Sequence, residues 1–272
     1  MISHQITNSF CENYNGVFYH AKSWEDHLHR SFEFLTLFEG KLLLKIGSDE
    51  YELSAGESVL VPPFVPHAIK ASEDSAFFIA VFSGNYAEDV ARLFKSKRAE
   101  SYKFTLSKKT EAYISEHLYP GADATIDEGT PMPKPRKFML KSCLYAISSE
   151  FLDGATLREN KREDMLILDV LSFIEAHYLE NITLRDMARS LGYTHEYVSR
   201  VFNRTLGINF KALVNQHRLE HAIGLIRESD EALVSIAMSS GFQSLRSFNR
   251  ACRDTLGVSP SQIKRNNWED FR

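Results

Sequence analysis

The chain has 272 residues, of which 43% are hydrophobic and 25% are charged, and its formal net charge is −4 at pH 7. This balance is ordinary for a globular protein of one or two domains with a sizeable core. No apolar run approaches the roughly 18 residues that a membrane helix needs, and Met1–Phe10 lacks the features of a signal peptide. The three cysteines are far apart and form no CxxC pair, so we expect a cytoplasmic protein without a disulfide framework.

Residues 1–85 are predicted to form strands. Short runs rich in aromatic and β-branched residues are separated by Gly or Pro, a pattern typical of strands; they lie at 34–38, 42–46, 58–61 and 77–82. Glu39-Gly40 stands between two of these runs, as the turn of a hairpin would. So many short strands in one segment predict a small barrel or sandwich.

Residues 86–153 are predicted to form a helical extension of that barrel. Apolar residues recur there at helical spacing, most clearly in 138–152. The polar segment 154–163 contains Gly154 and is typical of a linker. The remaining residues, 164–272, show helical spacing throughout, so the whole chain is predicted to be an α+β protein.

The helical segment contains an internal repeat. Ala188 and Gly192 recur 49 residues later as Ala237 and Gly241, and 200–208 matches 250–258 at an offset of 50. Each copy predicts two helices joined by a tight turn at the glycine, and the two copies are joined by a helix over 210–226. In the first copy Thr183 and Asp186 have the spacing of a capping box.

The second helix of each copy is predicted to have one buried and one outward face. The outward residues supply hydrogen-bond donors and acceptors that match base edges and phosphates. We therefore take as candidate DNA-binding residues Glu196, Ser199, Arg200, Asn203 and Arg204 in the first copy, and Gln243, Arg246, Ser247, Arg250 and Arg253 in the second.

The charge distribution agrees with this interpretation. Residues 183–266 contain 12 Lys and Arg against 7 Asp and Glu, a net charge of +5, so the rest of the chain carries −9. A basic segment on an acidic chain indicates a polyanionic partner. An ordinary helical bundle with a solvated basic face would explain one such unit, but it explains poorly two units with matching glycines and arginines.

Residues 165–266 resemble the AraC/XylS transcription regulators. The resemblance rests on 182–188, 198–202, Arg218-Leu219-x-x-Ala222, 236–242, 248–250 and 256–260. It implies sequence-specific binding to double-stranded promoter DNA, with base-reading positions at Glu196, Ser199, Arg200, Gln243, Arg246, Ser247 and Arg250. The sequence departs from the family at Cys252, where Phe is usual, and at Ile263-Lys264, where Tyr-Arg is usual.

That family commonly carries an N-terminal cupin-like barrel that senses a small molecule, and the N-terminal part resembles the cupin motifs. The matching residues are His27, His29, Glu33, Gly40, Gly56, Pro62 and His67, whereas Ala21, Phe64 and Ala71 depart from the pattern. If 27–33 forms one extended strand, its odd-numbered side chains share a face, and His67 could join them from a neighbouring strand. Three His and one Glu would suit Zn, Fe, Mn or Ni.

Three interpretations of these four residues stay open. They could line a pocket for a small polar effector, such as a sugar or a related metabolite, with no cofactor required. They could bind a divalent metal, and the chain would then be a cupin enzyme fused to a DNA-binding domain. They could also be purely structural, in a barrel that serves only for dimerisation.

The leading interpretation is a ligand-responsive transcription regulator that is not an enzyme. We expect it to form a homodimer, because the predicted helix 138–151 is more apolar than a lone surface helix requires. We also expect it to contact RNA polymerase if it activates transcription, and to have no contact with a membrane.

Overall fold

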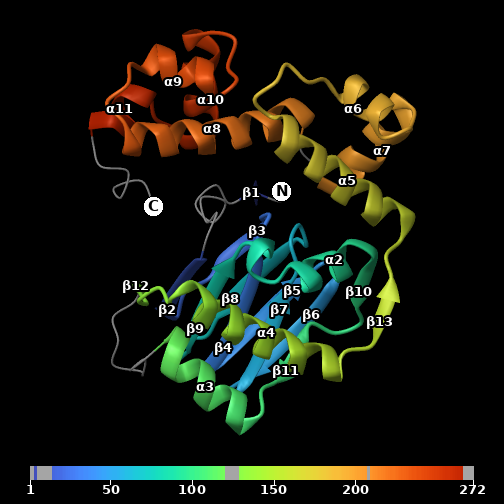
Figure 1. Cartoon of the computed structure of the whole chain (residues 1–272), viewed down its shortest axis with the longest axis vertical. Helices are drawn as coiled ribbons and strands as arrows, with labels where there is room; N and C mark the ends of the chain where they lie inside the picture. The colour runs from blue at the N-terminus through green and yellow to red at the C-terminus, as the bar shows by residue number, and fades with distance from the viewer. Residues whose placement is uncertain (1–2, 5–13, 120–128, 207–208, 266–272) are drawn as a thin grey trace. The chain divides into compact units, whose positions relative to one another are not determined.

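The computed structural model describes residues 3–4, 14–119, 129–206 and 209–265 (Figure 1). The chain divides into two compact units, residues 1–161 and 162–272. The predicted α+β class is confirmed, because the first unit is built mainly of strands and the described part of the second is helical. None of the described helices is long and apolar enough to cross a membrane.

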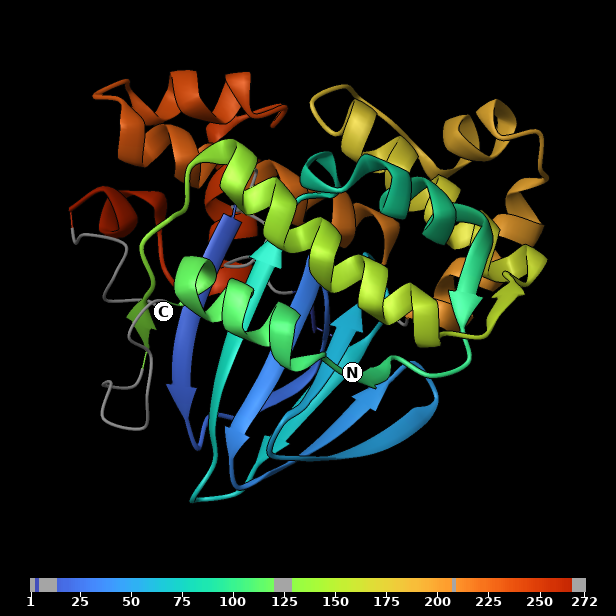
Figure 2. The same ribbon diagram turned by 60° about the horizontal axis from the view of Figure 1, so that its bottom comes forward.

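Two sheets form the body of the first unit (Figures 1 and 2). One sheet has, in spatial order, β1 (Ser3–His4), β3 (Trp24–Leu28), β8 (His67–Ala71), β5 (Lys41–Ile46) and β6 (Asp49–Ser54). The other has β11 (Lys103–Thr105), β7 (Glu57–Val61), β4 (Phe32–Glu39), β9 (Ala76–Phe82), β2 (Tyr14–His20) and β12 (Thr130–Pro131). All neighbouring strands are antiparallel except β1 and β3.

The burial pattern of the strands shows which sides are covered. In β5 the side chains alternate, with Leu42, Leu44 and Ile46 buried and the residues between them exposed, as expected for a sheet with one solvated face. In β9 every residue is buried, so both faces of the second sheet are covered.

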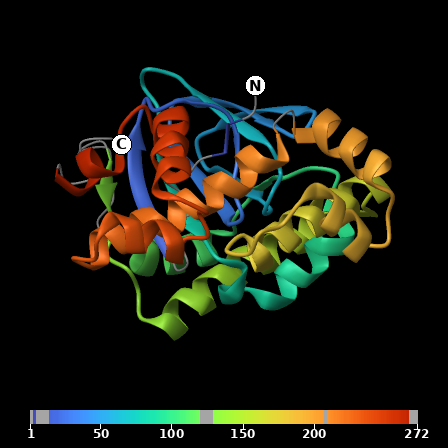
Figure 3. The same ribbon diagram turned by 90° about the horizontal axis from the view of Figure 1, so that it is seen from above.

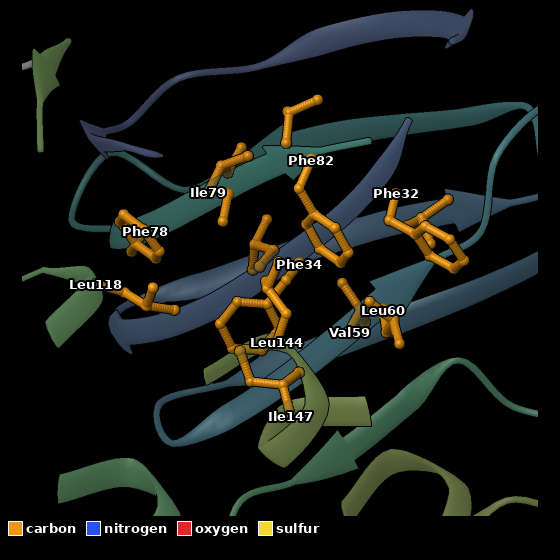
Figure 4. Close-up of a cluster of buried hydrophobic side chains, with 14 of the residues drawn as sticks. Phe32, Phe34, Val59, Leu60, Phe78, Ile79, Phe82, Leu118, Leu144 and Ile147 are labelled. Carbon is orange, nitrogen blue, oxygen red and sulfur yellow. The ribbon is translucent and has the colours of Figure 1, made fainter. Parts of the chain in front are cut away.

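Helices cover the outer face of this second sheet. They are η1 (Gly84–Tyr86), α2 (Glu88–Ser96), α3 (Lys108–Leu118) and α4 (Lys137–Gly154). Leu118 of α3 and Leu144 and Ile147 of α4 lie against Phe34 and Phe78 of the sheet (Figure 4).

The packing of α4 bears on the expected homodimer. The apolar residues that motivated that expectation are buried within the protomer, since Leu140, Cys143, Leu144, Ile147 and Phe151 are at most 1% exposed. The apolar side of this helix therefore covers the sheet of its own protomer.

The strands after residue 85 depart from the predicted boundaries. β11 and β12 extend the second sheet, and β10 (Lys97–Ala99) pairs with β13 (Leu157–Glu159). The expected linker 154–163 therefore contains a strand, and α5 begins at Arg162. Strands of two or three residues show no alternation in the sequence, and their partners are distant along the chain, as in the pairing of Lys97 with Glu159. Helical spacing nearby therefore dominated the prediction.

The second unit consists of seven helices in its described part: α5 (Arg162–His177), α6 (Leu184–Ser190), α7 (His195–Leu206), α8 (Phe210–Glu228), α9 (Leu233–Ser239), α10 (Leu245–Leu256) and α11 (Pro260–Arg265). Helices α6 and α7 form one helix-turn-helix unit and α9 and α10 form another. The long helix α8 joins the two (Figures 1 and 3).

Candidate functional site

The first helix-turn-helix unit begins with a local cap. The hydroxyl of Thr183 accepts from the backbone N–H of Asp186, and the Asp186 carboxylate accepts from the N–H of Thr183, so the predicted capping box is confirmed. After α6, Gly192 makes the turn with φ +75°, a conformation that favours glycine. The turn directs α7 across α6.

Helix α7 has the two faces that its sequence predicts. Val198, Val201 and Phe202 are at most 1% exposed and pack inward. On the other side the side chains of Glu196, Arg200, Asn203 and Arg204 are exposed and that of Ser199 is half-buried.

Several of these outward side chains already have partners within the unit. Arg204 forms an ion pair with Glu163 of α5, and the Arg200 guanidinium lies 5.6 Å from the centre of the Tyr197 ring. The Asn203 amide donates to the hydroxyl of Ser199 over 3.4 Å. A DNA phosphate must therefore compete with Glu163 for Arg204.

Helix α10, in the second helix-turn-helix unit, also begins with a capping box, which involves a predicted base-reading residue. The Ser244 hydroxyl accepts from the N–H of Ser247, and the Ser247 hydroxyl accepts from the N–H of Ser244 and donates to its carbonyl over 2.7 Å. Ser247 is half-buried rather than freely exposed. Its hydroxyl fixes the start of the helix, a role that the outward-face prediction did not include.

The remaining candidates on α10 form a basic surface. Arg246, Arg250 and Arg253 are exposed, and Arg250 pairs with Asp254 over 3.4 Å. Gln243, just before the helix, is also exposed. These arginines line a shallow groove that also includes Asn249. Asn249 is not among the predicted outward residues, although its position three residues after Arg246 could have indicated it.

The four histidine and glutamate candidates of the barrel lie together, although not for the predicted reason. His27 lies on β3 opposite His67 of β8, and Glu33 lies on β4 of the other sheet. His29 lies in the connection between β3 and β4, because β3 ends at Leu28 and the chain turns there. The expectation of one extended strand is therefore wrong, and the cluster bridges two sheets. All four residues are at most 2% exposed.

Backbone carbonyls fix the orientation of the three imidazoles. Each Nδ1 lies within hydrogen-bond distance of a carbonyl two residues away: 2.7 Å for His27, 3.0 Å for His29 and 2.8 Å for His67. A carbonyl only accepts, so each Nδ1 carries the proton and each Nε2 is left to face the others. Nε2 of His29 lies 3.2 Å and Nε2 of His67 lies 3.6 Å from the Glu33 carboxylate.

Burial and mutual charge shape the ionisation of this cluster. Burial, together with the charge of the neighbouring His67, lowers the pKa of His27 to about 4. Burial also lowers the pKa of His29. Burial opposes ionisation of Glu33 and His67 as well, but their attraction for each other outweighs it. The pKa of Glu33 is therefore held well below its usual range, and that of His67 is raised.

Hydrogen-bond accounting shows what the cluster requires. Three Nε2 atoms and one carboxylate converge, and one such atom from each residue lies within 4.8 Å of all the others. A neutral imidazole with Nδ1 protonated can only accept a hydrogen bond at Nε2. Four acceptors without a proton among them repel one another in a buried site. The cluster therefore requires a cation, either a shared proton or a metal ion.

Comparisons with known proteins cover both units. The model of the cupin domain matches residues 19–82, and that of a helix-turn-helix domain matches residues 187–266. An uncharacterised HTH-type transcriptional regulator of Bacillus subtilis, YisR, is 20% identical over 269 residues, which are 92% of this chain and 91% of YisR. An uncharacterised HTH-type transcriptional regulator of Staphylococcus aureus is 30% identical over 101 residues, and those residues are 37% of this chain and only 14% of that protein.

Solved structures of ToxT from Vibrio cholerae share the fold. One, described as bound to an unsaturated fatty acid, is 13% identical with a TM-score of 0.55, covering 93% of this chain and 96% of that one. Another, described as bound to (E)-4-(8-methylnaphthalen-1-yl)but-3-enoic acid, is 13% identical with the same TM-score of 0.55, covering 93% and 98%. Neither description names a sugar, so the expectation of a sugar-type effector has no support from these structures.

Proposed function

We propose that one protomer binds two successive major-groove segments of DNA through α7 and α10. The premise is that this chain is a DNA-binding transcription regulator with an AraC-type helix-turn-helix domain and a cupin domain. The observation that supports the proposal is the pair of outward polar faces on two helices within one compact unit. In this proposal residues 162–272 bind DNA and residues 1–161 sense a ligand.

The outward residues divide by their place on the helices. Arg200 and Arg250 lie mid-helix, where a guanidinium can make two hydrogen bonds to guanine. Arg204 and Arg253 lie nearer the helix ends and are proposed to contact phosphates. Glu196, Ser199, Asn203, Gln243 and Arg246 complete the proposed base-reading surface, and Ser247 contributes by fixing the start of α10.

Footprinting tests this arrangement. Successive major-groove faces of DNA lie about 10 base pairs apart, so one protomer should protect an asymmetric site of roughly 20 base pairs. The DNA that flanks the protein's own gene is the first target, and fragments enriched from a random library are the second. Protection of only about one helical turn by each protomer would contradict the proposal.

For the barrel, we propose that His27, His29 and His67 through Nε2 and Glu33 through a carboxylate oxygen hold a divalent transition metal. The convergence of four buried acceptors supports this, and the carbonyl bonds at Nδ1 are the partners that metal-binding histidines usually have. The four candidate ligand atoms lie within 4.8 Å of one another, a separation small enough for one ion to be bound by all of them. A bound metal would supply positive charge and a Lewis acid for an anionic effector.

Metal analysis of the purified full chain tests this proposal. Near-stoichiometric metal is expected, together with a rise of the melting temperature on adding Zn²⁺, Mn²⁺ or Ni²⁺ to the metal-depleted protein. Glu33→Gln and His29→Ala should abolish that rise. His117→Ala, in α3 and outside the cluster, is the matched control. An equal rise in all four proteins would show that the cluster does not bind these metals.

We also propose that the protein forms a homodimer through the outer side of α4. The supporting observation is that Phe138 is 83% exposed and Tyr145, seven residues later on the same side, is 38% exposed. Sedimentation of the full chain and of Phe138→Asp tests it. A monomeric wild-type chain at micromolar concentration would contradict it.

A further inference from the structure

The two helix-turn-helix units meet at a junction made by three segments. These are the loop Tyr178–Glu180 between α5 and α6, Arg218 of α8, and the turn Gly241-Phe242 between α9 and α10. A Cβ atom added to Gly241 would lie 2.8 Å from both Cα and O of Leu179. The turn of the second unit therefore touches the backbone of the loop that leads into the first.

Arg218 holds this junction together. Its Nε donates to the carbonyl of Tyr178 and its Nη2 to the carbonyl of Glu180, both over 2.7 Å. The residue is only 8% exposed, and its guanidinium lies 6.0 Å from the centre of the Phe242 ring. One buried side chain on the connecting helix thus binds the entrance of the first unit and contacts the turn of the second. Hydrogen bonds from a charged donor are stronger than neutral ones, so this contact resists bending of α8.

The junction is not a general requirement of the turn. Gly192 occupies the matching position in the first unit with a similar φ of +75°, against +81° for Gly241. A Cβ on Gly192 would meet nothing within 4 Å. Both glycines satisfy the turn, and only Gly241 also brings the two units together.

We infer that Arg218 is a positioning residue that fixes how many base pairs must separate the two DNA segments bound by α7 and α10. The inference rests on the proposed function, because it needs both helices to engage one DNA molecule. Inserting one base pair between the segments moves them apart by about 3.4 Å and turns one relative to the other by about 35°. A locked pair of units cannot follow that change, whereas a pair freed at the junction can.

The test measures the spacing penalty, defined as the ratio of the Kd for DNA with one inserted base pair to the Kd for the parent site. The probes are a fragment enriched by the wild-type full chain from a random library, and the same fragment with one base pair inserted or removed between its two protected segments. We expect a penalty of about tenfold or more for the wild type. For Arg218→Met, which keeps length but loses both hydrogen bonds and the charge, we expect about threefold or less.

Two further variants keep the test decisive. Arg218→Lys retains the charge but cannot bond both carbonyls in the same planar geometry. Gly241→Ala leaves the arginine in place but adds a Cβ that would lie 2.8 Å from the backbone of Leu179 and 3.0 Å from Nε of Arg218, so it disturbs the same junction from the other side. Both should lower the penalty, and Gly192→Ala should leave it at the wild-type value. Thermal unfolding of each variant identifies the folded ones, and if Arg218→Met does not fold, the Arg218→Lys and Gly241→Ala ratios decide.

The outcomes separate the inference from the proposed function. A wild-type chain that enriches no DNA contradicts the proposed function itself. A wild-type penalty near one, or equal penalties in the wild type and all folded junction variants, overturns the inference while leaving DNA binding intact. Arg218 also lines the groove that contains Ser199 and Asn203. If Arg218 contacts DNA directly, Arg218→Met would weaken binding by the same factor at every spacing. That result also overturns the inference.

Discussion

The two helix-turn-helix units share a scaffold and differ on the surface. Their buried faces correspond, with Val198 and Phe248 both fully buried 50 residues apart. The same offset pairs Glu196 with Arg246, Asn203 with Arg253, and Arg200 with Arg250. The duplicated elements have therefore retained their packing and changed their charge.

The outward arginines of the two helix-turn-helix units also differ in whether they form ion pairs within the protein. In the first unit Arg204 is paired with Glu163. In the second, Arg246 and Arg253 form no ion pair with another described residue. We therefore expect the second helix-turn-helix unit to supply more of the electrostatic attraction to phosphates, which is independent of sequence, and the first to depend more on directed contacts to bases. Matched substitutions in the two units should therefore have different effects.

The turn glycines should differ most. Alanine in the left-handed region costs about 1–2 kcal/mol, and this is the whole expected loss of unfolding free energy for Gly192→Ala. Gly241→Ala adds a backbone overlap with Leu179, for which overpacking costs about 1–3 kcal/mol more. Urea unfolding of both variants measures the difference. Equal losses would show that the second turn is no more constrained than the first.

The mid-helix arginines should have the next largest effect. Replacing Arg200 or Arg250 by Ala is expected to cost about 1–3 kcal/mol on the preferred DNA and to relax the preference at one base position. Binding isotherms on the preferred fragment and on random-sequence DNA measure this. Equal losses of Arg200→Ala on both DNAs would show that Arg200 does not read a base.

The helical unit could be predicted closely from the sequence because its signals are local. The connecting helix was expected over 210–226 and is Phe210–Glu228, and the capping box at Thr183 was found from its spacing. The junction could not be predicted, because Arg218 and the carbonyl of Tyr178 are 40 residues apart. Nothing in helical periodicity indicates which distant backbone a buried arginine will meet.

In the barrel, the residues of the site could be predicted from the sequence, but the arrangement that brings them together could not. The four residues of the buried cluster were identified from motif spacing, but the strand argument for their convergence was wrong because the chain turns after Leu28. The short strands β10 and β13 were missed because their pairing is non-local. For this domain the sequence identified chemically suitable residues, and the three-dimensional arrangement supplied the reason that they meet.

The arginines near the helix ends should separate the two units by salt dependence. Arg253→Ala is expected to reduce the slope of log affinity against log salt by about one. Arg204→Ala should reduce it less, because Glu163 already neutralises that guanidinium. Titrations at three or more salt concentrations give both slopes. Glu163→Gln is the matched control and should steepen the slope by freeing Arg204, and an unchanged slope would show that Arg204 stays away from the DNA.

The smallest effect should come from the position where the two units carry opposite charges. Glu196 and Arg246 are both exposed near the start of their helices. Glu196 can be neutralised to Gln with little change of shape, and Arg246→Gln removes the opposite charge at the corresponding position. Glu196→Gln removes a repulsion from phosphates and should strengthen binding to random-sequence DNA about two- to threefold. Arg246→Gln should weaken it by a similar factor.

Binding to the preferred fragment tests whether Glu196 also contacts a base, because a carboxylate can accept from the amino group of cytosine. If Glu196→Gln binds that fragment more tightly by the same factor as random DNA, the carboxylate is solvated and the first unit reads DNA without it. If it instead loses affinity only there, Glu196 contacts a base, and the opposite charges at this position reflect different roles of the two units.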